Sequence, residues 1–452
     1  MSDVQSEVQT FLDRLAERNA RRGEEPTWIA ARRQAGAARF EAMGFPNRRV
    51  EAWKYTDVRA IARGDFALAS DADFSPATAA ALTLPIEAHR LTFVDGVFSA
   101  ALSQLEGLPE GVQLLPLSRA LEENHEAVGG PLGRLTGVEF STFSALNTAF
   151  MEEGAVLRLA PGTVVEKPIV LQFLSRANEA PVMSHPRILV EAGGRSEATL
   201  IEHHVGEEGA ANFTNLVEEV ILDRNAILTH YKLQEAALAD LHVASIHVEQ
   251  ARDSRYTSFN LNLGGGLVRT DLITDLNGQG ADAHFYGLFY GQGRQHVDSH
   301  TLANHNAPHT TSNENYKGIL DDRAHGVFNG KVVVKRDSQK IEGFQSNANL
   351  LLSDRAEIDA KPELEIYADD VKCSHGTTTG QLDEEAIYAL RSRGIDRQTA
   401  RGLLTLAFAG EVLELVDLDA ISERVELAVA GKLPERFNLA GLVEAAVALG
   451  DE

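Results

Sequence analysis

The only cysteine of the chain, Cys373, lies two positions before His375 in the stretch DDVKCSHGTTTG (369–380). Thiolate and imidazole are ligands of soft and borderline metals, so a Cys-x-His pair indicates metal ligation. In an extended strand the two side chains lie on one face, about 6.5 to 7 Å apart, together with the apolar Val371. One cysteine cannot form an internal disulfide or complete a metal cluster site. Two alternatives stay open here: part of a metal site, or side chains of a buried core.

Histidines are the second group that could do chemistry. Twelve of the 15 histidines lie between residues 203 and 375. Five of them gather in or near HVDSHTLANHNAPHTTS, namely His284, His296, His300, His305 and His309. Their spacing matches no fixed zinc motif, since the chain has neither HExxH nor paired CxxC. They are therefore either ligands of a metal or polar ladders between stacked strands.

Motifs for nucleotide binding and for serine nucleophiles are absent from the sequence. The chain has no G-x-x-x-x-G-K-[ST], no dinucleotide-binding glycine spacing and no G-x-S-x-G. If ATP acts on this protein, we expect a partner to bind it.

Composition narrows the class of protein. The length of 452 residues predicts two to four structural units at about 150 residues each. A net charge of −24 argues against binding to nucleic acid, which depends on Lys and Arg. One cysteine fits a reducing cytoplasm. The charged N-terminal stretch lacks the apolar run of a signal peptide, and no window has the 18 or so apolar residues of a membrane span.

Three regions must position these residues. Residues 1–90 are predicted to be mostly helical, and residues 91–380 to be a β-rich core with an Asp95-Gly96 hairpin. From about residue 151, similar polar turns begin at 193, 223, 252 and 277, each followed by a short extended run. Such spacing favours a β-helix over a sandwich, because a coil of short strands and turns needs about 20 to 30 residues.

Residues 381–452 are predicted to be a helical C-terminal region. Asp383 is the expected N-cap of its first helix, and Gly394 is the expected stop. Leu404 and Phe408 belong to an apolar stripe of the next helix. A helical unit outside a β core can cap the stack of coils or carry a partner.

Two long segments carry a resemblance to a known family. HTLANHNAPHTTSNENYKGILDDRAHGVFNGKVVV (300–334) and QSNANLLLSDRAEIDAKPELEIYADDVKCSHGTTTGQLDEEAIYALRSRGI (345–395) resemble the SufB/SufD family of iron–sulfur cluster assembly proteins. Weaker similarity lies at 49–58 and 143–171. SufB subunits carry more cysteines and a Glu-His-Glu triplet at this histidine. Here the triplet is Ser374-His375-Gly376, so the chain is more similar to the SufD subunits, although Thr377 stands where these usually have Ala.

The resemblance implies a fold, partners and site residues. The fold is a right-handed parallel β-helix core flanked by N-terminal and C-terminal helical regions. The partners are SufB, paired through the β-helix, and two copies of the ATPase SufC, docked on helices at roughly 383–431. His375 carries over as a ligand of a transient iron–sulfur cluster, or of iron, shared with SufB, and Cys373 is a weaker candidate. ATP would act only through SufC. We expect the partner interface to include Tyr388, Leu390, Arg393, Leu404 and Phe408.

Three hypotheses about function follow. The first is a non-catalytic scaffold subunit of the SUF system in the cytoplasm, which helps nascent cluster formation or the delivery of iron. The second is a metal-dependent β-helix enzyme, a lyase or hydrolase, that uses the His-rich segment and paired carboxylates on adjacent coils. The third is an adaptor in which His375 is inert. Whether the chain forms a homodimer when SufB is absent stays open.

Overall fold

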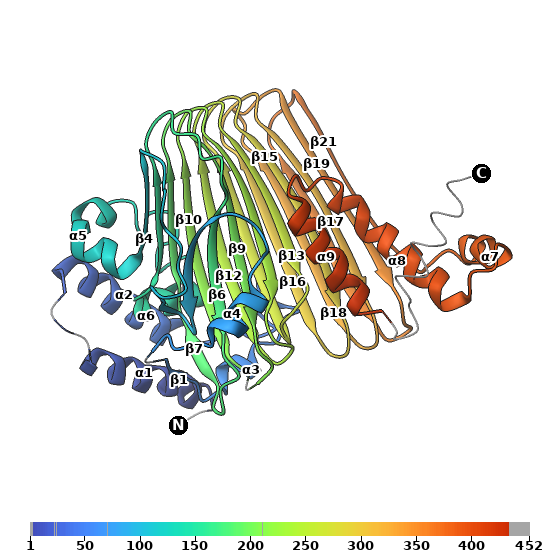
Figure 1. Cartoon of the computed structure of the whole chain (residues 1–452). Coiled ribbons are helices and arrows are strands. Elements are labelled where there is room, and N and C mark those ends of the chain that lie inside the picture. The colour runs from blue at the N-terminus through green and yellow to red at the C-terminus, as the bar shows by residue number, and fades with distance from the viewer. Residues whose placement is uncertain (1–2, 22, 24, 70, 210, 434–452) are drawn as a thin grey trace.

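Parallel strands stacked in coils form the centre of the molecule (Figure 1). The computed structural model describes residues 3–433 except 22, 24, 70 and 210. About eight coils follow one another, and each gives one strand to an 11-stranded sheet and one to a 10-stranded sheet. The first sheet contains β5 (Gly154–Leu159), β8 (Arg187–Ala192), β10 (Phe213–Leu222), β12 (Leu241–Gln250), β14 (Leu267–Leu276), β16 (His296–His305), β18 (His325–Val334) and β20 (Glu357–Ile366). The second contains β6 (Ile169–Ser175), β9 (Glu197–Gly206), β11 (Ile227–Glu235), β13 (Arg255–Asn262), β15 (Asp282–Gly291), β17 (Thr311–Leu320), β19 (Ile341–Leu351) and β21 (Val371–Gly380).

Equivalent residues of successive coils lie in register. In one column Leu267 pairs with His296, which pairs in turn with His325, so the repeat is 29 residues (267 to 296 and 296 to 325). This repeat falls within the coil length that the polar turns predict. The parallel β-helix flanked by helical regions is therefore confirmed.

The polar turns form the corners of the coils. Arg195, Asn225, Asp253 and Asp322 each adopt a left-handed backbone, with φ of 62°, 57°, 54° and 54°. Asn and Asp tolerate this conformation better than most residues, and it lets the chain reverse direction within a few positions. The recurrence of short polar runs in the sequence is thus the recurrence of one corner geometry.

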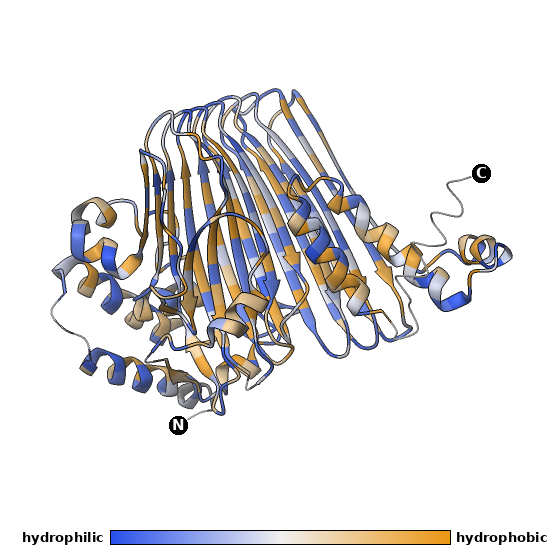
Figure 2. Ribbon diagram, viewed as in Figure 1, coloured by the Kyte–Doolittle hydropathy of each residue, from blue (hydrophilic) through white to orange (hydrophobic). Residues whose placement is uncertain are grey.

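Hydrophobic and hydrophilic residues alternate along many of the strands (Figure 2). Successive side chains of a strand point to opposite faces, one to the lumen, which is the space between the two sheets, and the next to the outer face. The lumen holds the largest apolar cluster, with Leu216, Val220, Phe285, Phe328 and Val332 among its buried members. This alternation decides which strand residues can meet inside the β-helix.

The helices of the N-terminal region lie mostly on the outer face of the 11-stranded sheet, whereas the helix Pro76–Leu82 packs through Ala79 against Leu174 and Val205 of the 10-stranded sheet. It comprises α1 (Asp3–Arg21), α2 (Thr27–Met43), η1 (Glu51–Trp53), α3 (Arg59–Ala62), β1 (Ala67–Leu68), α4 (Pro76–Leu82), β2 (His89–Val94), β3 (Val97–Phe98), β4 (Val112–Pro116), α5 (Leu117–Gly129), α6 (Thr142–Phe150) and, later in the chain, β7 (Val182–Ser184). Phe11, Phe40 and Phe143 pack in one cluster with Phe213 and Leu241. The predicted hairpin is present, because β2 pairs antiparallel with β3 across Asp95-Gly96.

The C-terminal helices are α7 (Glu384–Ser392), α8 (Arg397–Leu413) and α9 (Asp419–Gly431). α8 and α9 cover the outer face of the 10-stranded sheet, where Val412 and Val425 pack against Tyr231 and Phe259. α7 projects away from the coils (Figure 1). Asp383 caps α7 as predicted, accepting a hydrogen bond from the Glu385 backbone N–H. Residues 434–452 of the predicted C-terminal region lie outside the described residues.

Among the described residues, no helix has both the length and the apolar composition that crossing a membrane requires.

Candidate functional site

The last coil of the β-helix has an open edge on both sheets. Among the described strands, β20 pairs only with β18 and β21 only with β19, so each is the terminal strand of its sheet. Both strands are ten residues long, and none of their side chains is fully buried. Their outer N–H and C=O groups lack a strand partner among the described residues, and long unpaired edges of this kind are templates for another strand.

Cys373 and His375 lie on β21 at this open end. Cys373 stands opposite Gly343 of β19, and His375 stands opposite Gln345. Val371 and Cys373 pack against the apolar lumen cluster, which shows that their shared face points inward. Two positions further along the strand, His375 is exposed. The prediction that the Cys-x-His pair shares a face with Val371 therefore agrees with the strand geometry.

The two side chains differ in their surroundings. Burial raises the pKa of the Cys373 thiol, although the Gly343 backbone stabilises the thiolate by a hydrogen bond. A protonated thiol is a poor metal ligand. No hydrogen bond or ion pair holds the His375 side chain among the described residues, and imidazole binds metal in its neutral form. The geometry alone therefore makes His375 the more available ligand.

The residues predicted for a partner interface separate into two sets. On α7, Tyr388 is 72% exposed and Arg393 follows the helix, also exposed, while Leu390 is half-buried. On α8, Leu404 is half-buried, and Phe408 lies against Lys317 of β17, whose Nζ is 4.3 Å from the ring centroid. α7 therefore offers the free surface, whereas Phe408 already contacts the β-helix.

The His-rich segment does not converge on one site. His296 contacts the Thr56 hydroxyl at 2.8 Å on an outer face, whereas His305 bonds Thr310 and Ser312 in the lumen. His300 pairs with Asp298, His284 pairs with Asp282, and His309 occupies a left-handed corner. The hypothesis of a shared metal site in this segment finds no such grouping among the described residues.

The sequence did not predict one group of side chains that could act as metal ligands. Glu202 of β9, Glu218 of β10 and His230 of β11 meet inside the lumen. Part of the signal was visible, since EHH (202–204) and HYK (230–232) lie one coil apart and Glu202 pairs with Lys232 in register. Glu218 comes from the opposite sheet, and no spacing rule predicts that approach.

Two family profiles match the chain. The SufBD protein N-terminal region matches residues 8–171, and the SUF system FeS cluster assembly, SufBD core domain, matches residues 173–408. The core match alone covers more than half of the chain. The chain belongs to the SufBD family.

Full-length relatives agree with this assignment. An iron–sulfur cluster assembly SufBD family protein of Synechocystis sp. is 34% identical over 94% of this chain and 96% of its own length. The iron–sulfur cluster assembly protein SufD of Escherichia coli is 32% identical over 86% of this chain and 90% of its own. Protein ABCI7, chloroplastic, of Arabidopsis thaliana is 29% identical over 89% and 85%. This SufBD family member is thus an iron–sulfur cluster assembly protein whose relatives include SufD.

Proposed function

We propose that this SufBD family member is the SufD-type scaffold subunit of a SUF assembly complex. It pairs with SufB through its last coil, binds SufC through its C-terminal helices, and presents His375 at the shared interface. There His375 helps to hold a nascent iron–sulfur cluster or to deliver iron. The observation that carries the proposal is the place of His375, on the terminal strand β21, whose outer edge no described strand covers.

The open edge supports pairing with another β-helix. A second open coil of similar length can add strands to β20 and β21 and satisfy their outer backbone groups. A homodimer would use the same edge when SufB is absent.

Ligand chemistry supports a shared site over a self-contained one. Iron–sulfur clusters are held by several thiolate or imidazole ligands, and this chain offers at its open end one imidazole and one protonated thiol. The remaining ligands would come from the partner across the interface. Because the imidazole must be neutral, binding should weaken as His375 protonates in acid.

The exposed surface of α7 supports binding of the ATPase. An aromatic side chain such as Tyr388 on a protruding helix is typical of an interface anchor. This chain has no P-loop, so ATP would act through SufC. ATP bound by SufC would move the C-terminal helices and thereby the interface.

The test is co-expression of the chain with SufB and SufC, followed by purification and cluster reconstitution. We expect a stable complex, and we expect His375→Ala to assemble normally while cluster formation is lost. Ser374→Ala is the matched control, since its side chain points to the opposite face of β21.

Two results would contradict the proposal. A His375→Ala complex that matures clusters as well as the Ser374→Ala complex would make His375 inert and favour a pure adaptor. A chain that remains a monomer with SufB and SufC present would remove the scaffold function altogether.

The alternative function, a metal-dependent lyase or hydrolase, requires turnover by the isolated chain. Its paired carboxylates would be Glu202 and Glu218, which are wholly buried and out of reach of a sugar-sized substrate.

A further inference from the structure

The lumen holds a cluster of ionisable side chains in the N-terminal half of the β-helix. Glu202, Glu218 and His230 each offer one ligand atom, and these atoms lie within 4.8 Å of one another. All three side chains are wholly buried. We propose that this cluster, the lumen site, binds a first-row divalent transition-metal ion through two carboxylates and one imidazole. The proposal is independent of the role of His375.

Distances in the lumen site suit an ion more than direct hydrogen bonds. His230 Nε2 lies 3.7 Å from Glu202 Oε2 and 3.8 Å from Glu218 Oε2. These separations exceed hydrogen-bond length. Ligand atoms about 2.1 Å from a shared ion lie roughly 3.0 to 3.6 Å apart for bond angles of about 90° to 120°. A contraction of a few tenths of an ångström would therefore bring His230 and each carboxylate to the separation of ligands on one ion.

The ligand atoms also lack other partners. Both oxygens of Glu218, the Oε2 of Glu202 and the Nε2 of His230 make no hydrogen bond to a described residue outside the cluster, so these atoms face only one another. Leaving a buried polar group unsatisfied costs about 1 to 3 kcal/mol, and more for a charged one, so such groups are rare. Three side chains whose remaining free atoms face one another indicate a ligand with affinity for all of them.

His230 is held in the orientation that ligation needs. Its Nδ1 is 3.0 Å from the Tyr256 hydroxyl, so Nε2 points to the two carboxylates. A hydrogen bond on the far nitrogen is the usual arrangement for metal-binding histidines, because it fixes the tautomer and the ring.

The donor set selects the class of metal. Mixed imidazole and carboxylate ligands suit Fe²⁺, Mn²⁺ and Zn²⁺, whereas Cu⁺ prefers thiolates and Ca²⁺ prefers oxygen alone. No thiol takes part, since the only cysteine is Cys373 at the other end of the lumen.

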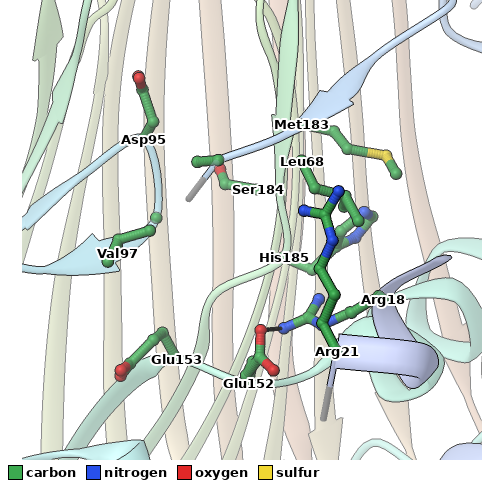
Figure 3. Close-up of a pocket in the computed structure, with 12 residues that line it drawn as sticks. Arg18, Arg21, Leu68, Asp95, Val97, Glu152, Glu153, Met183, Ser184 and His185 are labelled. Carbon is green, nitrogen blue, oxygen red and sulfur yellow. Dashed lines mark hydrogen bonds and ion pairs between the residues drawn. The ribbon is translucent and has the colours of Figure 1, made fainter. Parts of the chain in front are cut away.

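An ion would enter toward the lumen site from the surface pocket of about 320 Å³ shown in Figure 3. The pocket shares Asp95, Gly96 and Ser184 with a narrow cavity of about 20 Å³, which has room for one water molecule or ion. His204 and His242 line that inner cavity. His204 in turn bonds Glu202, the first ligand of the lumen site.

The charge of Lys232, next to the lumen site, predicts a substitution that strengthens metal binding. The ammonium of Lys232 forms an ion pair with the other oxygen of Glu202. Two ionised carboxylates, this ammonium and a divalent ion sum to one positive charge. Removing the ammonium should therefore strengthen binding of a cation, since repulsion in a buried site is weakly screened.

The experiment uses the full chain, stripped with a chelator and titrated anaerobically with Fe²⁺ and, as a spectroscopic probe, Co²⁺. We expect one ion per chain, a rise in Tm with metal concentration, and Co²⁺ bands without a thiolate charge-transfer band. Glu218→Gln should weaken binding at least about 100-fold, because even outer partners of a metal site typically contribute 10- to 100-fold. Lys232→Gln should strengthen it.

Matched variants test whether the ion binds at the lumen site or elsewhere in the protein. Glu314→Gln changes another wholly buried lumen carboxyl and should bind metal as the unaltered chain does. His375→Ala and Cys373→Ser should also bind normally. Glu218→Gln should fold, because burial raises the pKa of Glu218 to about 8 and the amide mimics the protonated carboxyl.

Three outcomes would overturn the proposal. One is an unaltered chain that binds neither ion. Another is a Glu218→Gln chain that keeps full affinity while its fold, checked by circular dichroism, is unchanged. The last is loss of the bound ion on His375→Ala, which would place it at the open end of the β-helix and leave the lumen site as a structural ion-pair cluster.

Discussion

Gly343 lies directly opposite Cys373 in the ladder between the last two strands of its sheet, and the missing side chain leaves room for the thiol. A Cβ at Gly343 would be 3.2 Å from the Cys373 Sγ, closer than ordinary contact. The small residue of β19 thus keeps the only thiol of the chain partly accessible at the open end of the lumen.

Gly343→Val should cover the Cys373 thiol. We expect reaction of the native chain with a thiol reagent to slow several-fold, because the added methyl groups fill the space beside Sγ. Gly376→Ala, on β21 itself, is the control, since a Cβ there would meet nothing within 4 Å. Equal labelling rates in the two variants would show that Gly343 does not govern access.

Tyr388→Ala and Phe408→Ala should act on different properties. Tyr388 is 72% exposed, so its removal should leave the free energy of unfolding within about 0.5 kcal/mol and weaken capture of SufC. Phe408 packs on Lys317, so its removal should lower the unfolding free energy by at least about 1 kcal/mol. Denaturant titration and a SufC pull-down distinguish the two, and unchanged SufC binding by Tyr388→Ala would argue against α7 as the anchor.

Glu314→Gln should make the protein less sensitive to alkaline pH. Burial raises the pKa of Glu314 from 4.5 to about 7, although a hydrogen bond from Thr301 favours the ionised carboxylate. In the folded chain this group holds its proton more tightly than in the unfolded chain. Its contribution is therefore fully present below pH 4.5 and is lost as the pH rises through 7, by up to about 3 kcal/mol.

Guanidinium unfolding at pH 5 and pH 8 measures this effect. The difference in unfolding free energy between Glu314→Gln and the unaltered chain should grow in favour of the variant between these values. A difference that is independent of pH would mean that Glu314 ionises normally in the folded protein.

Gly36→Val should separate two N-terminal helices. A Cβ on Gly36 of α2 would lie 2.8 Å from the Ala145 carbonyl oxygen and 2.8 Å from the Ala149 backbone nitrogen, both on α6. Backbone cannot yield as a side chain does, so we expect destabilisation of roughly 1 to 3 kcal/mol or more. Thermal unfolding measures it, with Gly130→Ala as a control at an open position.

The architecture could be predicted because it repeats. Corners such as those at Asn225 and Asp322 recur with the same polar composition, and their spacing approximates the length of a coil. Local capping was predictable at Asp383, whereas Pro26 occupies the N-cap of α2 without a side-chain hydrogen bond.

The candidate sites were predictable only where strand periodicity decided them. Alternation placed Cys373 and His375 on one face, because both lie on one strand. The meeting of Glu202 with Glu218 depends on how two sheets face each other across the lumen, which no local pattern contains. Similarly, the apolar stripe of α8 did not indicate that Phe408 would face Lys317 instead of solvent.

During synthesis, every coil of a β-helix exposes an edge until the next coil covers it. Of the described strands, β20 and β21 are the last to leave the ribosome, and no later described strand covers them. The open edge formed by β20 and β21 is therefore completed only when all earlier coils are already stacked. A copy whose open edge stays uncovered can pair with other exposed strands and aggregate, so the proposed pairing with SufB would also protect solubility.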